Sequence, residues 1–224
     1  MINRLFIKTV LFIIIIYSLI LAQTGTKYFL SYNDFVRDVD VSPSKVFGKS
    51  FYRAKYNQDR VRQLDQIQAD GQLVTRTYFY YDRYLNLVLS EHYTADSTLL
   101  TRTSFVPDEV QKQMLQKIQG RNWISLQKDY FTISYFDSTG KPFQHVVKAA
   151  SGEDVGRLEL RYNEKGALIY EVWIRTRDNK VMEVSEFEWD AEKSVQHIVQ
   201  YDSSGFEISN ISLKLPANPA DSTR

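Results

Sequence analysis

A hairpin pattern recurs along this chain and is clearest at residues 161–171, RYNEKGALIYE. Residues 157–162 alternate between apolar and charged side chains, as a half-buried strand requires, and this period does not suit a helix. Asn163 to Gly166 supply turn chemistry, because asparagine tolerates unusual backbone angles and glycine takes positive φ without a steric penalty. Alternation resumes at Leu168. The stretch therefore predicts two strands joined by a short turn.

Copies of this pattern, an aromatic residue followed by Asp or Asn and a polar turn, are spread along the chain. They stand at Tyr56-Asn57, Tyr81-Asp82, Phe136-Asp137, Trp189-Asp190 and Tyr201-Asp202. From Tyr56 to Tyr81, Phe136 to Tyr162 and Tyr162 to Trp189 the marker aromatics are 25, 26 and 27 residues apart. A fixed period of this length is typical of repeat arrays, in which each unit buries its apolar face against its neighbours. The pattern thus predicts an array of β-hairpins.

Strands are predicted wherever alternation resumes between turn signals. The predicted segments are 51–56, 61–68, 74–81, 87–94, 99–106, 130–136, 143–149, 157–162, 168–174, 181–189, 194–201 and 206–215.

One segment, residues 108–119, has a helical period instead. Val110, Met114, Leu115 and Ile118 form an apolar stripe on one side of a helix, with Pro107 and Asp108 suited to its start and Gly120 to its end. We expect this helix to cover part of one sheet face or an end of the sheet. A role in binding a partner in a groove is the alternative.

The hairpin motifs resemble the tyrosine- and aspartate-rich repeats of bacterial RHS/YD proteins and, equally, the MORN-like hairpin repeats of some bacterial antitoxin-type and envelope proteins. The matching residues are Tyr80-Tyr81-Asp82, Tyr135-Phe136-Asp137 to Gly140, Tyr162-Asn163 to Gly166 and Tyr201-Asp202 to Gly205. Leu85 and Lys193 stand where these repeats have glycine. The resemblance implies a repetitive β-sheet used as a shell, platform or binding surface, and it brings no catalytic residues.

We therefore predict a mainly β fold: an antiparallel β-hairpin repeat array, either an open twisted sheet or a partly closed barrel, with one amphipathic helix. The expected order is a signal peptide at 1–22, an irregular lead-in at 23–50, the repeat domain at 51–215 with its helix at 108–119, and a flexible tail at 216–224.

The N-terminal segment predicts export. Arg4 and Lys8 precede an unbroken apolar run from Val10 to Ala22, and a small residue at its end is typical of a secretory signal peptide. The run is short for a membrane span, so no stable span is expected after cleavage. An uncleaved inner-membrane signal anchor is the alternative. We expect an exported protein of the bacterial periplasm or cell surface. It is held together without disulfides, because the sequence has no Cys.

Charge and motifs exclude several classes of function. The net charge is +1, from 28 basic and 27 acidic residues, so no field attracts a phosphate backbone and nucleic-acid binding is not expected. The sequence lacks a glycine-rich phosphate loop, a GxSxG elbow and an HExxH motif.

Neither the histidines nor the carboxylates predict a site. His92, His145 and His197 lie on separate predicted strands, and no two have a local metal-ligand spacing. Glu186 and Glu188 share a strand face, a spacing that two catalytic acids could use, but a solvated strand face explains them as well. We predict no catalytic residues, no cofactor and no metal site, and we expect the protein not to be an enzyme.

Aromatic side chains are the remaining candidates for binding. Tyr78 and Tyr80 alternate to one face of a predicted strand, and Trp173 and Trp189 lie on later strands. Such side chains on an exposed face can stack a glycan or dock a protein. Their structural alternative is cross-strand packing between neighbours. These four residues form the predicted interaction surface.

The sequence thus predicts a non-catalytic envelope or surface protein that presents a β-repeat platform to a protein or polysaccharide of the envelope. The alternative is a soluble periplasmic carrier that binds a small apolar ligand inside a curled sheet.

Overall fold

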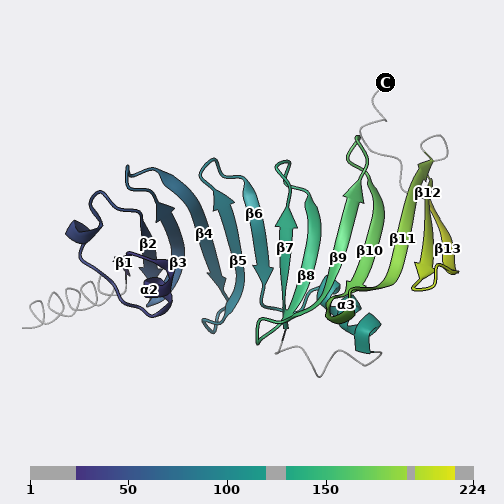
Figure 1. Cartoon of the computed structure of the whole chain (residues 1–224), viewed down its shortest axis with the longest axis horizontal. Coiled ribbons are helices and arrows are strands. Elements are labelled where there is room, and N and C mark those ends of the chain that lie inside the picture. Colours follow the sequence, from purple (N-terminus) through teal and green to yellow (C-terminus); the bar gives the residue numbers. More distant parts are fainter. Residues whose placement is uncertain (1–23, 120–129, 191–194, 215–224) are drawn as a thin grey trace, which may run out of the picture. The chain divides into compact units, whose positions relative to one another are not determined.

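The computed structural model of the protein describes residues 24–119, 130–190 and 195–214. The predicted signal peptide, the predicted tail and Lys193 lie outside these residues. Over these described residues the fold is mainly β, with thirteen antiparallel strands that follow one another in the sheet in chain order from β1 to β13 (Figure 1). In this order β1 and β13 each have one neighbouring strand, so the sheet is open. The predicted antiparallel hairpin array is confirmed in its open form.

Two compact units make up the chain, residues 1–100 and 101–224. Within the described residues, no helix has the length and apolar character needed to cross a membrane.

The first unit begins with elements that the sequence analysis missed. Its elements are β1 (Thr24–Phe29), α2 (Tyr32–Val36), the 3-10 helix η1 (Pro43–Val46), β2 (Phe51–Asn57), β3 (Arg60–Ile67), β4 (Leu73–Tyr81) and β5 (Leu87–Thr94). The prediction of an irregular lead-in over residues 23–50 is therefore wrong for β1, which pairs with β2 along its whole length. The first four residues of β1 are Thr, Gly, Thr and Lys, and only Tyr28 and Phe29 follow, so the strand has no alternation of apolar and polar residues to recognise.

The core of the first unit lies on one face of β1, β2 and β3. Phe29, Ala54 and Leu64 are buried there, and Phe35 of α2 packs edge-on against Phe29 with ring centroids 5.4 Å apart. Ser31 caps α2, because its hydroxyl accepts a hydrogen bond from the Asp34 N–H at 3.1 Å. The short helix therefore covers this face and leaves the opposite face of β2 to β5 to other side chains.

The second unit holds the long hairpins. Its elements are β6 (Leu99–Ser104, from Thr101 on), α3 (Glu109–Gln119), β7 (Tyr130–Phe136), β8 (Pro142–Ala149), β9 (Asp154–Tyr162), β10 (Leu168–Arg175), the 3-10 helix η3 (Thr176–Asp178), β11 (Lys180–Asp190), β12 (Val195–Asp202) and β13 (Glu207–Lys214). The predicted strands of this region agree with these bounds to within a few residues.

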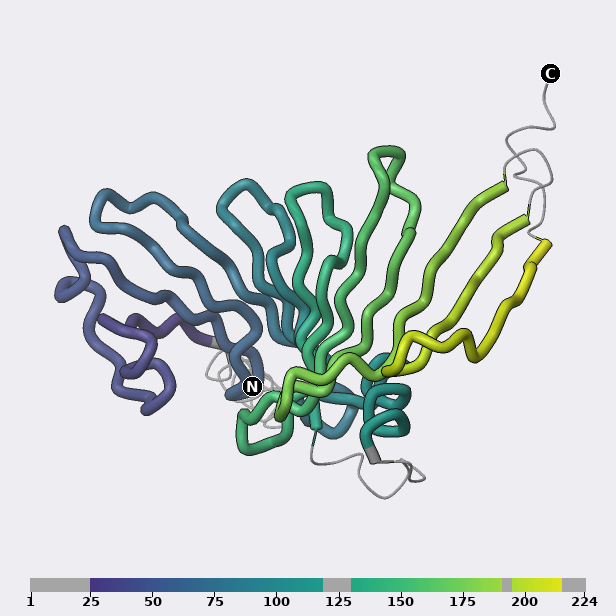
Figure 2. Tube along the Cα trace, turned by 45° about the vertical axis from the view of Figure 1, so that its right-hand side comes forward, coloured from purple at the N-terminus to yellow at the C-terminus, as the bar shows by residue number. Residues whose placement is uncertain are grey.

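The helix predicted at 108–119 is confirmed as α3. Asp108 caps it by accepting a hydrogen bond from the Gln111 N–H at 2.8 Å. Met114 is buried against Val147, Leu158 and Trp173, which form the core of this unit. α3 contacts β7, β8 and β9 and lies beside the same ends of these strands (Figure 2). It therefore covers one end of one sheet face, as expected.

Most turns between strands share one geometry. At Asp82, Asp137, Asn163 and Asp202 the backbone N–H donates to the carbonyl four residues on, and the N–H three residues on donates back. The fourth residue of each turn has positive φ, and it is glycine at Gly140, Gly166 and Gly205 but leucine at Leu85, with φ of 65°. The Asp carboxylates also accept from the N–H groups two and four residues on. This double function explains the recurring Asp in the motif.

Candidate interaction surface

The face of β2 to β5 opposite the first unit's core is made of arginines, tyrosines and carboxylates. Strand register places Arg53, Asp65, Arg76 and Tyr93 directly opposite one another on four successive strands. The next row on this face holds Gln63, Tyr78 and Glu91, and Tyr80 follows Tyr78 by two residues. We call Arg53, Asp65, Arg76, Tyr78, Tyr80, Glu91 and Tyr93 the arginine–tyrosine face.

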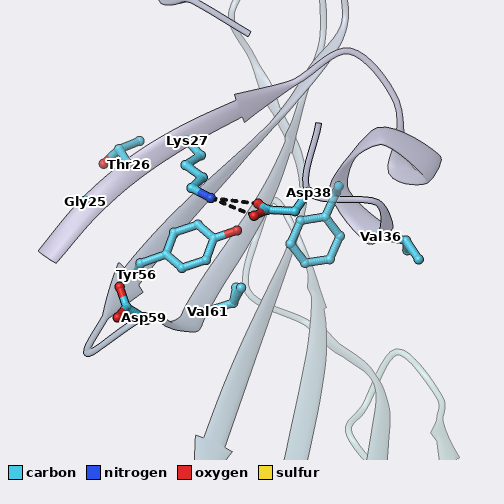
Figure 3. A pocket seen from close by; sticks show the side chains of 9 residues that line it. Gly25, Thr26, Lys27, Val36, Asp38, Tyr56, Asp59 and Val61 are labelled. Carbon is cyan, nitrogen blue, oxygen red and sulfur yellow. Dashed lines mark hydrogen bonds and ion pairs between the residues drawn. The ribbon is translucent and has the colours of Figure 1, made fainter. Parts of the chain in front are cut away.

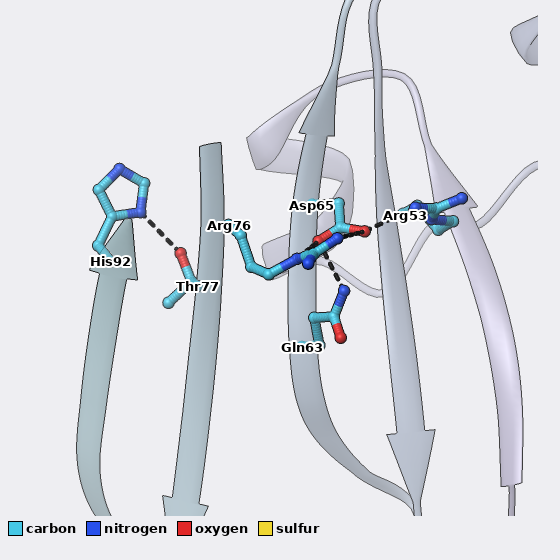
Figure 4. Close-up of polar contacts among 6 residues, drawn as sticks. All are labelled: Arg53, Gln63, Asp65, Arg76, Thr77 and His92. Atoms are coloured by element: carbon cyan, nitrogen blue, oxygen red, sulfur yellow. Dashed lines mark hydrogen bonds and ion pairs between the residues drawn. The ribbon is translucent and has the colours of Figure 1, made fainter. Parts of the chain in front are cut away.

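Asp65 lies at the centre of this face and is 0% exposed. Arg53 donates from Nη2 to its Oδ2 at 2.7 Å, and Arg76 donates from Nε to its Oδ1 at 2.7 Å. Gln63 adds a third donor at 2.8 Å (Figure 4). Burial alone raises the pKa of Asp65, but the hydrogen bonds from Arg76, Arg53 and Gln63 outweigh it, and the pKa lies below its usual range. The carboxylate therefore holds both guanidinium groups in place.

A second buried carboxylate orients two tyrosines. Glu91 is 8% exposed, and its Oε2 accepts hydrogen bonds from Tyr80 Oη and Tyr93 Oη, each at 2.9 Å. Burial, with the hydrogen bond to Glu91, raises the pKa of Tyr80 to about 12, so its phenol stays protonated at neutral pH. Tyr80 is nevertheless 41% exposed. Its hydroxyl is fixed while part of its ring faces solvent.

The rings and guanidinium groups of this face also contact one another. Tyr78 and Tyr93 meet edge-to-face with centroids 5.8 Å apart, and the Arg76 guanidinium lies 6.0 Å from the Tyr78 ring centroid. Such contacts favour one arrangement of each side chain. The face therefore offers ring surfaces, phenol edges and guanidinium planes in fixed positions.

The first unit also has a pocket of about 650 Å³ beside β1 (Figure 3). Lys27 Nζ lies 2.7 Å and 3.0 Å from the two carboxylate oxygens of Asp38, at its centre, and 5.1 Å from the Tyr56 ring centroid. The hydrogen bond to Asp38 raises the pKa of Lys27, and burial raises the pKa of Tyr56. Phe35 and Val61 line the apolar side. Because Lys27 is already paired with Asp38, it offers no free positive charge to a ligand, and the second carboxylate of the lining, Asp59, lies in the exposed turn after β2.

The four predicted interaction residues have different surroundings. Tyr78 and Tyr80 lie together on the arginine–tyrosine face. Trp173 is 3% exposed in the core of the second unit, so its prediction as a surface residue is wrong. The alternation of residues along β10 does not tell a covered face from an exposed one, and here α3 covers the face that carries Trp173. Trp189 is 48% exposed and lies on β11 in the second unit.

Each histidine pairs with a hydroxyl on the neighbouring strand. His92 points toward Thr77 on the neighbouring strand (Figure 4), and its Nδ1 lies 2.8 Å from Thr77 Oγ1. The Nδ1 atoms of His145 and His197 lie 2.7 Å from Ser134 Oγ and 2.9 Å from Ser212 Oγ. Among the residues that the structure describes, no group of three or more His, Cys, Asp or Glu side chains is placed to hold a metal ion.

Three glutamates of β11, Glu183, Glu186 and Glu188, lie on its two faces. Glu183 pairs with Lys117 of α3, which also lies 5.0 Å from the Trp173 ring centroid. Glu186 lies on the other face, where Tyr201 Oη donates to it at 3.4 Å. Register places Glu188 opposite His197.

Sequence reasoning missed the charged members of the arginine–tyrosine face. Arg53 and Asp65 stand at distances from the turn between β2 and β3 that differ by one residue, as do Asp65 and Arg76 from the next turn, and a bulge in each hairpin takes up the difference. Opposite charges at such mirrored positions were the available signal, because a hairpin brings these positions together on one face.

No family model and no curated protein matches this sequence. Among solved structures, the chain is similar to a mutant of S. aureus TarM, with a TM-score of 0.30 and 10% identity over 60% of this chain and 21% of that one. It is also similar to TcdB2-TccC3, with a TM-score of 0.20 and 8% identity over 75% of this chain and 12% of that one. The chain thus spans about a fifth or less of the structures it matches, and these likenesses carry no functional argument.

Proposed function

We propose that this protein is a non-catalytic exported protein of the envelope or cell surface whose sheet is a binding platform, and that the arginine–tyrosine face is its binding surface. The observation that carries the proposal is the fixed arrangement of this face. Two buried carboxylates, Asp65 and Glu91, hold two arginines and two tyrosines in place while Tyr80 stays exposed. A surface ordered before binding loses little side-chain entropy when a partner docks.

A polysaccharide fits this face best. Tyrosine rings can stack on sugar rings, and guanidinium and phenol groups can hydrogen-bond to hydroxyls. The charges of Arg53 and Arg76 are balanced by Asp65 and Glu91, which suits a partner without strong charge. A protein segment is the second partner class, because the same groups can contact backbone carbonyls.

The roles of the carboxylates support a non-catalytic function. Asp65 is wholly buried and accepts from three side chains, so it is not placed to act on a bound molecule. Glu91 has both tyrosine hydroxyls as donors on one oxygen. Their arrangement orients neighbours rather than a reacting group. The carrier alternative needs a sheet closed around a cavity, whereas this sheet is open.

Binding to envelope polysaccharides and to peptide libraries, measured by calorimetry and surface capture, tests the proposal. Tyr80→Ala should weaken binding about 3- to 10-fold, the size of one aromatic contact. Tyr84→Ala is the matched control, since Tyr84 is an exposed tyrosine in the adjacent turn and lies outside the face. Equal losses in both variants, or no binding of either polymer class, would reject this surface.

Export has its own test. Mass spectrometry of the protein recovered from its host should give the mass of a chain that begins at Gln23, the residue after the proposed cleavage site, with or without the loss of ammonia by which an N-terminal glutamine cyclises. Recovery of the intact N-terminus with the membrane fraction would instead support the signal anchor.

A further inference from the structure

The last strand of the sheet, β13, is an edge strand whose side chains are nearly all exposed to solvent. Every residue of β13 except Ser209 is exposed. Ile208, Ile211 and Leu213 are among its exposed side chains, and β12 is its one neighbour in the strand order. Edge strands present unpaired backbone N–H and C=O groups, and a long apolar edge is a template for another strand.

The other edge of the sheet is protected in a way that β13 is not. On the outer side of β1, Val41 forms an antiparallel bridge with Tyr28, and the Val41 N–H donates to the Tyr28 carbonyl at 2.8 Å. This bridge occupies backbone groups that a further strand would need. The two edges are therefore not equivalent, and a head-to-tail chain of copies is disfavoured.

The two faces of β13 differ in character. Pairing with β12 places Ser209, Ile211 and Leu213 on the face shared with Phe187 and Trp189, two strands away. A bulge near Tyr201 then places Glu207 on the opposite face, together with Asn210, Ser212 and Lys214. The strand is thus apolar on one face and bears one charge of each sign near the two ends of its other face.

This layout is self-complementary about Ile211. If a second β13 runs antiparallel with Ile211 opposite its own copy, Asn210 meets Ser212 and Ser209 meets Leu213 of the second copy. Ile208 is the extra residue of the bulge, so Glu207 takes the next position on the face of Asn210 and Ser212. There it lies opposite Lys214 of the second copy. A shift of this pairing by two residues in either direction also keeps the apolar faces of the two strands on one side of the sheet. In those registers Glu207 and Lys214 of the two copies are no longer opposite each other. Within the described chain neither of these two residues has an ion pair of its own.

We propose that β13 pairs antiparallel with β13 of a second copy of this chain, around a two-fold axis at Ile211. The pairing continues the antiparallel sheet across the axis and forms two equal Glu207–Lys214 ion pairs. It also brings Ile211 and Leu213 of the two copies together on one face of the sheet, the face that carries the exposed Trp189. This interface goes beyond the proposed function, which lies in the first unit.

Charge reversal tests the register. The full chain should sediment as a dimer in analytical ultracentrifugation at about 0.1 M salt. Lys214→Glu should raise the dimer dissociation constant several-fold, because Glu207 then faces a like charge, and Glu207→Lys should do the same. The double variant Glu207→Lys with Lys214→Glu restores the opposite pairing and should recover the dimer. A monomeric wild-type chain, or a double variant as weak as the single ones, would overturn the proposal.

Cross-linking tests the axis directly. The sequence has no Cys, so Ile211→Cys introduces a single thiol that meets its own copy. Opposite residues of antiparallel strands have Cα atoms about 4.5–5.5 Å apart, within disulfide range. Mild oxidation should link this variant into a covalent dimer, whereas Ser204→Cys, exposed in the turn before β13, should stay unlinked. Linkage through position 204 but not 211 would refute the two-fold axis, and unchanged circular dichroism verifies that both variants are folded.

Discussion

A Cβ atom on Gly156 would lie 2.3 Å from Met114 Sδ, so α3 rests directly on the backbone of β9 at this glycine. The same Cβ would meet Met114 Cγ at 3.0 Å and Ile118 Cδ1 at 3.1 Å. Real carbon atoms do not approach sulfur this closely, so any side chain at 156 moves the helix or Met114. The missing side chain, rather than a special backbone angle, is what the glycine supplies.

Gly156→Ala should therefore destabilise the second unit by about 1–3 kcal/mol, the usual cost of overpacking. Chemical denaturation followed by tryptophan fluorescence measures it, because Trp173 lies in the affected core. Met114→Ala removes the two nearest clashing atoms and leaves only the contact with Ile118, so the double variant should cost less than the sum of the two single ones. Additive costs would show that the helix does not bear on Gly156.

The turn at Asp82 should be improved by one substitution. Leu85 has φ of 65°, where a left-handed conformation costs a side-chain-bearing residue roughly 1–2 kcal/mol. Leu85→Gly removes this strain but adds backbone entropy to the unfolded chain, about 0.5–1 kcal/mol, so a net gain near 0.5–1 kcal/mol is expected. The midpoint of urea denaturation measures it.

Gly140→Ala is the converse change in an equivalent turn. Its φ is 80° and nothing lies within 4 Å of an added Cβ, so only backbone strain enters. We expect a loss of about 1–2 kcal/mol. A loss of stability in Leu85→Gly, or none in Gly140→Ala, would contradict the shared turn geometry.

Asp65→Asn should destabilise the first unit by roughly 2–3 kcal/mol. A fully buried ion pair that loses one partner costs about 3–5 kcal/mol, and the partial exposure of Arg53 and Arg76 reduces this cost. Because the folded pKa of Asp65 is lowered, its contribution is complete above the unfolded value near 4 and is lost as pH falls through the folded pKa. In the variant, the free energy of unfolding measured by urea denaturation should therefore fall less between pH 5 and pH 2 than in the wild type. Asp59→Asn, in an exposed turn, is the control.

Glu171→Gln should stabilise the protein at neutral pH. Burial raises the pKa of Glu171, Glu183 raises it further, and Lys117 opposes both. A carboxyl group with a raised folded pKa contributes stability below its unfolded pKa and loses it as pH rises through the folded value. The advantage of the variant should hence be present at pH 7.5 and absent near pH 3.5. Thermal unfolding at both pH values checks this, and a variant weaker than wild type at pH 7.5 would refute it.

The strands were predictable because their alternation and turns are local. The Asp, Asn and Gly of each turn act within five residues, so the hairpins at Asp137 and Asn163 could be located from sequence alone. The helix at 108–119 was predictable for the same reason, since its stripe and its Asp108 cap are local features.

The features that sequence reasoning missed or misplaced depend on packing between residues far apart in the chain. Trp173 alternates like an exposed residue, and only the position of α3 shows that it is buried. β1 has too little alternation to be recognised, and it becomes a strand because β2 offers it an edge. The role of Asp65 required knowing both hairpin registers at once, because its partners Arg53 and Arg76 lie on different strands.

The sequential strand order determines how such a chain can fold and how it can change in length. Since each strand pairs with the next one along the sequence, every strand pairing joins neighbouring segments of the chain, and folding can start at a single hairpin and spread outward. Gain or loss of a whole hairpin pair between turns leaves the registers on either side unchanged. Length variation among descendants of this sequence should therefore come in steps of whole strand pairs.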